Sequence, residues 1–200
     1  NQKISFNQAL QLTIESFKQV NKNFEKLILN YFQKGLVDVY PKKNKYLIPR
    51  NIASSFLYPP FILLNFENKT SSLPQVVHEL AHAIHTHYLR KNNSPLNTKR
   101  ADYLRETIAL FFEFLFLENL KKKLDEKLIE AWSNKIKINY IFRNGVLFLT
   151  VDDLYKYYKK HKYVSLKIIN QTYRKNYKFI LGKNEAEKVS NYNWLLYFYK

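Results

Sequence analysis

The fold of this chain is decided by one stretch, Val77-His78-Glu79-Leu80-Ala81-His82-Ala83-Ile84-His85. It holds the pattern HExxH, in which two histidines are four residues apart. On a helix these positions share one face, so His78 and His82 can bind the same metal ion. Glu79 then lies about 100° round the helix, beside the ion, where its carboxylate can take a proton from a water molecule on the metal. The stretch therefore predicts a buried helix that carries two metal ligands and a general base.

A third metal ligand is predicted at Glu106, which follows His82 by 24 residues. Glu106 begins the strongly apolar run Glu106-Thr107-Ile108-Ala109-Leu110-Phe111-Phe112-Glu113. A carboxylate that faces an apolar interior needs a partner, which is either a metal ion or a salt bridge to Arg100, Arg105 or a lysine. We favour the metal ion over the salt bridge.

Two further polar residues, Glu113 and His85, are candidates for supporting roles. Glu113 lies two turns beyond Glu106, where it either orients a ligand histidine through the free ring nitrogen or is a solvated edge residue. His85 either supports the site and lines its cleft or is an exposed polar residue. We interpret His87 and His161 as surface residues.

Composition limits the class of protein further. The 200 residues are 46% hydrophobic and 16% aromatic, which excludes a disordered chain. There is no Cys, so disulfides and thiolate zinc sites are excluded. There is no Met either, and we expect the chain to be a fragment or a processed product of a longer protein. The longest apolar runs are shorter than the ~18 residues of a membrane span.

The formal net charge of +17 has two explanations. A basic chain can bind nucleic acid or an anionic membrane. Alternatively, the charge reflects a composition bias, since Lys, Asn, Ile, Tyr and Phe are all abundant. The basic residues are scattered and mostly Lys, whereas Arg, the better ligand for phosphates, is scarce. We therefore expect no nucleic-acid and no membrane partner, and a cytoplasmic location.

Hydrophobic periodicity and turn residues predict a mainly α fold with a small β element before the HExxH helix. The predicted helices cover about 7–34, 73–88, 99–120 with more helix to about 137, 152–160, 165–180 and 185–199. Gly35 ends the first of them, and Ser71 or Ser72 caps the second. The predicted strands lie within Leu36–Tyr40 and Phe61–Phe66, with an exposed turn at Lys42–Lys45 and a hairpin within Tyr140–Val151 around Asn144-Gly145.

Several segments in order resemble oligoendopeptidase F, of the thimet oligopeptidase family of zinc metallopeptidases. They are Gly35–Pro41, Pro60–Phe66, Val77–His85, and Glu106-Thr107 with Phe111 and Glu113. The resemblance covers about residues 20–120. It implies a helical metallopeptidase catalytic domain, here one domain over 1–200, from the C-terminal part of a longer peptidase whose N-terminal region is absent. It also implies a deep channel with Zn2+ at its floor.

The same resemblance implies hydrolysis of short, unfolded oligopeptides by metal-activated water. It assigns the zinc ligands to His78, His82 and Glu106 and the catalytic base to Glu79. We expect the peptide to add as an extra strand to the edge of Phe61–Phe66, unless that strand is central and paired on both edges.

Three departures from the family pattern bear on activity. Ala81 stands where relatives have Gly, Lys43–Pro49 lacks the family's glycines, and the tail lacks the family's His. Tyr197 and Tyr199 keep the family's Tyr pattern, and we expect them to donate to the oxyanion; alternatively they are ordinary core residues. Losing one oxyanion donor lowers a rate by ~10²–10³, so the alternative to an active peptidase is a degenerate relative that retains zinc or peptide binding.

Overall fold

The computed structural model describes residues 2–53, 58–93, 102–121 and 123–189. These residues are mainly helical with a small three-stranded sheet, so the predicted fold class is confirmed. Contacts divide the chain into two compact units, Asn1–Ile129 and Glu130–Lys200, and the single catalytic domain over 1–200 stays a prediction. Among the described helices, each is too short or too polar to cross a lipid bilayer.

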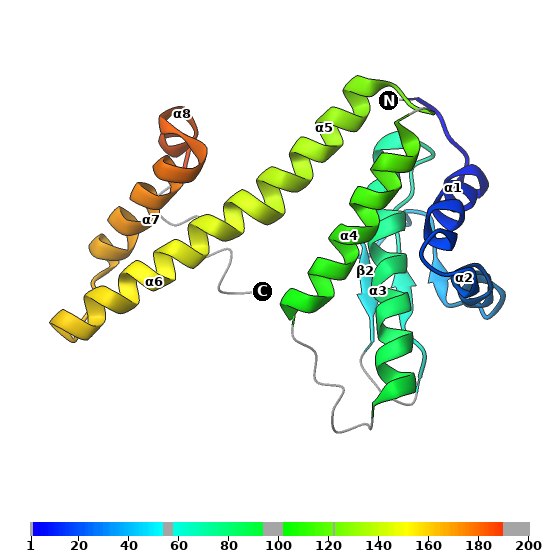
Figure 1. Cartoon of the computed structure of the whole chain (residues 1–200), viewed down its shortest axis with the longest axis horizontal. Helices are drawn as coiled ribbons and strands as arrows, with labels where there is room; N and C mark the ends of the chain where they lie inside the picture. The colour runs from blue at the N-terminus through cyan, green and yellow to red at the C-terminus, as the bar shows by residue number, and fades with distance from the viewer. Residues whose placement is uncertain (1, 54–57, 94–101, 122, 190–200) are drawn as a thin grey trace. The chain divides into compact units, whose positions relative to one another are not determined.

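Helix α3 lies at the centre of the first unit (Figure 1). Helix α4 runs alongside it in the opposite direction, and the two N-terminal helices pack against its other side. Fully buried Phe17, Leu80 and Phe116 form part of the core between these helices. The helices of this unit are α1 (Phe6–Lys18), α2 (Asn23–Gln33), the 3₁₀ turn η1 (Thr70–Ser72), α3 (Leu73–Asn92), α4 (Asp102–Leu120) and the start of α5 (Glu126–Ile136).

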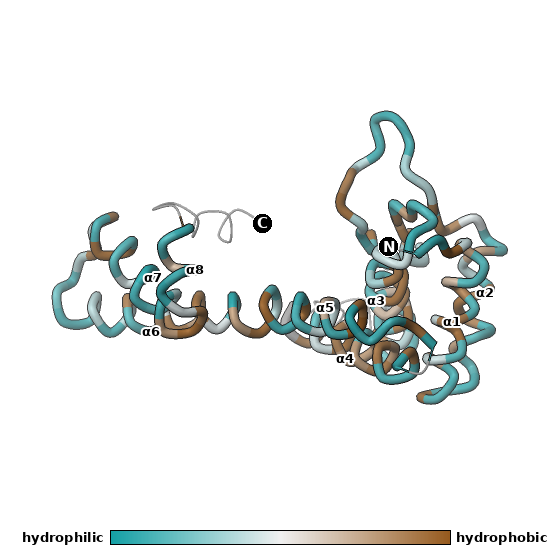
Figure 2. The backbone as a smooth tube through the Cα atoms, turned by 90° about the horizontal axis from the view of Figure 1, so that it is seen from above, coloured by the Kyte–Doolittle hydropathy of each residue, from teal (hydrophilic) through white to brown (hydrophobic). Residues whose placement is uncertain are grey.

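The N-terminal region folds as two helices, so the single helix predicted over 7–34 is wrong. Hydrophobic and hydrophilic residues alternate along both α1 and α2, which explains the continuous periodicity (Figure 2). The break between them lies at Asn21, whose side-chain oxygen accepts a hydrogen bond from the backbone N–H of Asn23 at 2.9 Å. Such local bonds compete with the helix. Gly35 follows α2 with φ of +65°, the left-handed conformation of a C-terminal cap.

The small sheet has the order β1-β3-β2, with β1 at Val37–Asp38, β2 at Arg50–Ile52 and β3 at Phe61–Leu63. β1 is parallel to β3 and β2 is antiparallel to it. Ile62, in the middle of β3, pairs with one residue on each side and is fully buried. The predicted free edge of the Phe61–Phe66 strand is therefore wrong, because this strand is central and the edges are β1 and β2.

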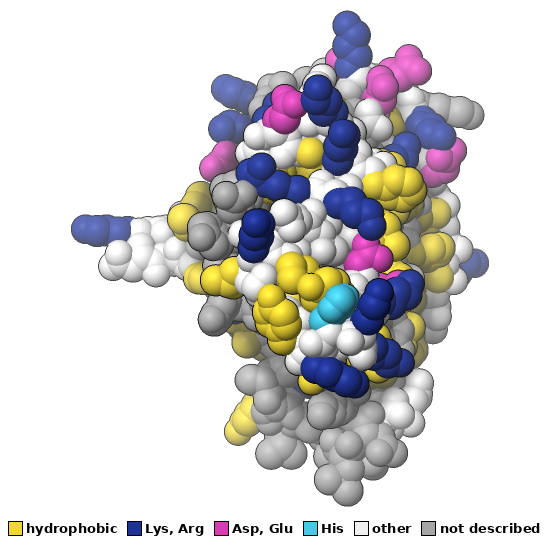
Figure 3. Space-filling view, turned by 90° about the vertical axis from the view of Figure 1, so that its left-hand side faces the viewer, with side chains coloured by type: hydrophobic (Ala, Val, Ile, Leu, Met, Phe, Trp, Pro, Cys, Tyr) yellow, Lys and Arg dark blue, Asp and Glu magenta, His cyan; other side chains and the backbone are white. Residues whose placement is uncertain are grey.

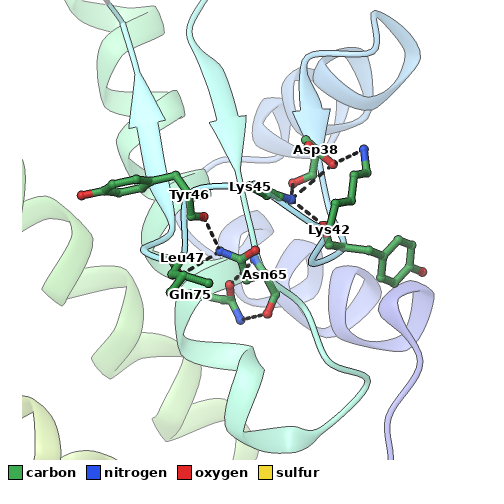
Figure 4. Close-up of polar contacts among 8 residues, drawn as sticks. Asp38, Lys42, Lys45, Tyr46, Leu47, Asn65 and Gln75 are labelled. Carbon is green, nitrogen blue, oxygen red and sulfur yellow. Dashed lines mark hydrogen bonds and ion pairs between the residues drawn. The ribbon is translucent and has the colours of Figure 1, made fainter.

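Two side-chain networks hold the chain between β1 and β2 (Figure 4). The Asn65 amide donates to the carbonyls of Tyr46 and Leu47 at 3.0 and 2.9 Å. Lys45 donates to the Tyr40 carbonyl at 2.7 Å and pairs with the Asp38 carboxylate at 3.2 Å. The expected exposed turn at Lys42–Lys45 is therefore wrong at its last residue, since the Lys45 side chain is only 5% exposed.

The start of α3 is held by a side chain of its first turn and not by its N-cap residue. Ser72 occupies the N-cap position, but its hydroxyl accepts a hydrogen bond from the backbone N–H of Glu67 and makes no cap bond. Gln75, in the first turn, instead exchanges two hydrogen bonds with the backbone of Asn65, at 2.7 and 2.9 Å (Figure 4). α3 is therefore anchored directly to the end of β3. Pro74 lies in its first turn, as predicted.

The second unit contains the π-helical stretch η3 (Lys137–Phe142), α6 (Arg143–His161), α7 (Leu166–Leu181) and α8 (Lys183–Glu187). The hairpin predicted around Asn144-Gly145 is wrong, because this segment is helical. Gly145 serves close helix packing instead of a turn: a Cβ atom there would lie 3.2 Å from Cδ1 of Ile180 on α7. Val146, Tyr173, Tyr177 and Val189 form the buried core of this unit.

Candidate metal centre

The antiparallel pair α3 and α4 brings the three predicted metal ligands together. One ligand atom from each of His78, His82 and Glu106 lies within 4.8 Å of the other two. Nε2 of His78 is 3.3 Å from Oε2 of Glu106, and Nε2 of His82 is 3.6 Å from Oε1 of the same carboxylate. The two imidazole rings lie edge to face, with their centroids 4.5 Å apart.

This donor set fits a zinc ion. Ligand atoms in a tetrahedral zinc site lie ~2.0–2.1 Å from the ion and hence about 3.3 Å from one another. The nitrogen–oxygen separations of 3.3 and 3.6 Å are close to that value. The Glu106 side chain is 40% exposed, whereas His78 and His82 are 12% and 2% exposed, so the centre is reached from the side of the carboxylate.

Glu113 contacts the ring nitrogen of His78 that faces away from Glu106. Its Oε1 lies 2.7 Å from Nδ1 of His78, and the Glu113 side chain is only 4% exposed. When Nδ1 donates its proton to this carboxylate, the Nε2 lone pair is free for a metal. Of the two alternatives for Glu113, the structure therefore favours the one in which it orients a histidine.

Without a metal, His78 is held as a cation. Burial alone lowers the pKa of His78, but hydrogen bonds to the carboxylates of Glu106 and Glu113 outweigh this effect and raise it to about 10. The three residues thus form a site of strong attraction for positive charge, which a proton or a metal ion can satisfy.

Glu79 lies beside the ligands and is 6% exposed. Burial raises the pKa of Glu79 to about 7, although the charges of His78 and Arg105 and a hydrogen bond from the backbone of Asn51 oppose the rise. Its Oε2 atom is buried without a hydrogen-bond partner. A buried carboxylate oxygen that lacks a partner is suited to accept a proton from a nearby water molecule.

Asn51 and Arg105 belong to this neighbourhood but were not predicted as site residues. Asn51 lies on the edge strand β2, and Arg105 on α4 donates to its carbonyl at 3.4 Å. The sequence contains no signal for Asn51, because a three-residue strand has no visible periodicity. Arg105 was noted only as a possible salt-bridge partner of Glu106; the structure places it against β2 instead.

The remaining candidate residues are not part of the cluster of His78, His82 and Glu106. His85 is half-buried on α3. His87 is half-buried rather than on the open surface, and its ring lies 5.4 Å from that of Tyr88. His161 is exposed, as predicted. Tyr197 and Tyr199 lie outside the described residues.

The chain is similar in sequence to two known peptidases. The chain is 28% identical to an oligoendopeptidase F homologue of Mycoplasma genitalium over 142 residues, which are 68% of this chain and 22% of the relative. It is 27% identical to oligopeptidase PepF of Bacillus subtilis over 128 residues, which are 62% of this chain and 18% of the relative. The predicted resemblance to oligoendopeptidase F is confirmed. The chain spans about a fifth of the length of these oligoendopeptidase F relatives.

The fold has a solved counterpart. A crystal structure of a candidate peptidase from Chlamydophila abortus superposes with a TM-score of 0.75 and 18% identity, covering 100% of this chain and 35% of that one. At this identity the similarity concerns the fold alone. No family model matches the chain.

Proposed function

We propose that this chain is part of a zinc-dependent peptidase that hydrolyses short, unfolded oligopeptides. The observation that carries the proposal is the cluster of His78, His82 and Glu106, with Glu79 buried beside it. The similarity to oligoendopeptidase F and PepF supports peptide-bond hydrolysis as the reaction. The donor set and its spacing support zinc as the metal.

The proposed roles follow from the position of each side chain. When bound, zinc would polarise the scissile carbonyl and lower the pKa of a nearby water molecule. Glu79 takes a proton from that water through its unpartnered Oε2 and then delivers it to the leaving amine. Glu113 holds the His78 ring in place through Nδ1. Tyr197 and Tyr199 remain our proposed donors to the oxyanion.

Oligopeptides are the proposed partners, with no nucleic acid and no membrane, and the cytoplasm is the proposed location. The mode of peptide binding expected from the sequence needs revision, because Phe61–Leu63 is the central strand. A peptide at this centre would meet β2 and its residue Asn51 instead.

Hydrolysis of a quenched peptide by the zinc-loaded protein tests the proposal. We expect turnover in the wild type, and none in Glu79→Gln with zinc still bound, because Glu79 is not a ligand. Equal turnover in both proteins would contradict the role of Glu79. A wild type that holds zinc but cleaves no peptide would favour the alternative, a degenerate relative that retains zinc or peptide binding.

A further inference from the structure

We propose that Arg105, supported by Asn51, forms a carboxylate-binding subsite beside the metal centre. The inference rests on the proposed peptidase function and adds a substrate class to it. The preferred peptides carry a carboxylate close to the scissile bond, either the free C-terminus or the side chain of Asp or Glu. The argument for this subsite comes from the closed edge of β2 and from polar atoms that lack partners.

The edge of β2 is already occupied by side chains. Asn51 pairs with Ile62 across the antiparallel ladder, but the Ile62 N–H bonds the Leu36 carbonyl on the other side of β3. Asn51 and Ile62 are therefore a pair that exchanges no hydrogen bonds, and the Asn51 backbone groups face outward. Its N–H bonds Glu79 and its carbonyl accepts from Arg105 at 3.4 Å.

This closure restricts how a peptide can be held. In an edge strand of only three residues, the outward N–H and C=O groups of Asn51 are the ones that an added strand would use. An added strand must therefore displace Glu79 from the Asn51 N–H and Arg105 from the Asn51 carbonyl, whereas a carboxylate of the peptide can bind Arg105 itself. The 3.4 Å bond is long for N–H···O, so the displacement of Arg105 loses little interaction energy.

Polar atoms at this place lack partners. Asn51 is 5% exposed, and both atoms of its side-chain amide are buried without a hydrogen bond. Nε of Arg105 is also buried without a hydrogen bond. Buried polar groups are nearly always paired, because an unpaired one costs about 1–3 kcal/mol. Arg105 contacts the backbone carbonyl of Asn51, while its Nε and the Asn51 side-chain amide have no partner among the described residues, which indicates a site that a ligand completes.

The chemistry of these groups selects a carboxylate as the ligand. A guanidinium presents parallel N–H donors that match the two oxygens of a carboxylate, and the Asn51 amide can add a further donor. The net charge of +17 favours the approach of acidic peptides in general. Lys and Arg side chains are spread among other side chains on the face drawn in Figure 3, so the positive charge of that face is diffuse, and Arg105 supplies the local recognition.

The test uses matched peptides on the zinc-loaded protein. Two pairs of quenched peptides are compared. The members of the first pair differ only in a C-terminal carboxylate or amide near the scissile bond. The members of the second pair are blocked and differ only in Glu or Gln next to that bond. We expect kcat/KM to be about tenfold to a hundredfold higher for the acidic member of at least one pair. The pair that shows the preference identifies the source of the carboxylate. Equal values in both pairs would overturn the inference.

Variants assign the preference to Arg105. Arg105→Gln removes the charge, and we expect the advantage of the acidic peptide to disappear, mainly through KM. Arg105→Lys keeps the charge without the parallel N–H donors of the guanidinium. This variant should retain a small preference for the acidic peptide, which separates loss of recognition from misfolding. Arg174→Gln is the control, because Arg174 also donates to a backbone carbonyl, that of Val189, but lies in the second unit; it should keep the full preference.

A binding measurement separates this inference from the proposed function. Fluorescence anisotropy of the labelled acid and amide peptides on zinc-loaded Glu79→Gln requires no turnover. Tighter binding of the acid form, lost in Glu79→Gln/Arg105→Gln, would support the subsite even if the wild type cleaves nothing. Equal dissociation constants, or no binding of either form, would overturn the subsite even if the wild type is an active peptidase.

Discussion

Oε1 of Glu113 lies 2.7 Å from Nδ1 of His78, so a carboxylate on α4 holds the ring of a candidate metal ligand on α3. Both side chains are largely buried, with 4% and 12% of their surfaces exposed. A buried hydrogen bond to a charged group is stronger than an exposed one, because water does not compete for it. The contact therefore fixes the direction in which Nε2 points.

The first prediction concerns this contact. Glu113→Gln should lower zinc affinity by about 10–100-fold, because the outer partner of a ligand histidine sets its orientation and basicity. Competition with a chelator measures the affinity. Glu118→Gln is the matched control, since Glu118 lies on the same helix but is 65% exposed and pairs only with Lys121 among the described residues. Equal affinities of the two variants would contradict a role for Glu113.

The second prediction concerns Lys45, which is buried between Asp38 and Tyr40. Lys45→Met should destabilise the protein by about 1–3 kcal/mol, because it removes the donor to the Asp38 and Tyr40 carbonyls and one of the two lysines that pair with the Asp38 carboxylate. Lys42→Met, at a side chain that is 64% exposed, should cost less than about 1 kcal/mol. Urea unfolding at pH 7 measures both changes. Equal losses would show that burial of Lys45 does not matter.

The pH dependence of this network is the third prediction. Burial raises the pKa of Asp38, but hydrogen bonds to Lys42 and Lys45 outweigh burial and lower it. A lowered pKa in the folded state contributes stability above the unfolded value of about 4, and this stability is lost as the pH falls through the folded pKa. The stability difference between wild type and Lys45→Met should therefore shrink from pH 7 to pH 3. A difference that stays constant would exclude this linkage.

Two glycines of the second unit provide the fourth prediction. Gly182 has a φ of +89°, so Gly182→Ala should cost about 1–2 kcal/mol. Gly145 lies within α6, where Ala gains about 1 kcal/mol in helix propensity, which offsets the contact of 3.2 Å with the mobile tip of Ile180. Gly145→Ala should therefore be close to neutral in thermal unfolding. A loss at Gly145 as large as that at Gly182 would show that Ile180 cannot move away from the added Cβ atom.

The sequence predicted the residues that cluster at the candidate metal centre, because most of the pattern is local. His78, Glu79 and His82 lie within one helical turn and a half, and Glu106 stands out as a carboxylate in an apolar helix. Helix periodicity also placed α3 and α4 correctly.

The errors arose where the outcome depends on contacts between distant residues. Gly145 has the sequence of a turn, but Ile180, 35 residues later, makes it a packing position. The strand at Phe61–Leu63 is apolar in either setting, and only pairing with Val37–Asp38 and Arg50–Ile52 makes it central. Likewise, the local sequence gives no sign that Arg105 contacts Asn51, because the two residues are 54 positions apart in the chain.

The most direct test of the central claim is zinc K-edge X-ray absorption of the zinc-loaded protein. The account predicts one zinc per chain with two imidazole nitrogens and carboxylate oxygen at ~2.0–2.1 Å, and loss of one imidazole in His78→Ala. A protein that binds no zinc, or a spectrum without imidazole that is the same in wild type and His78→Ala, would contradict the account.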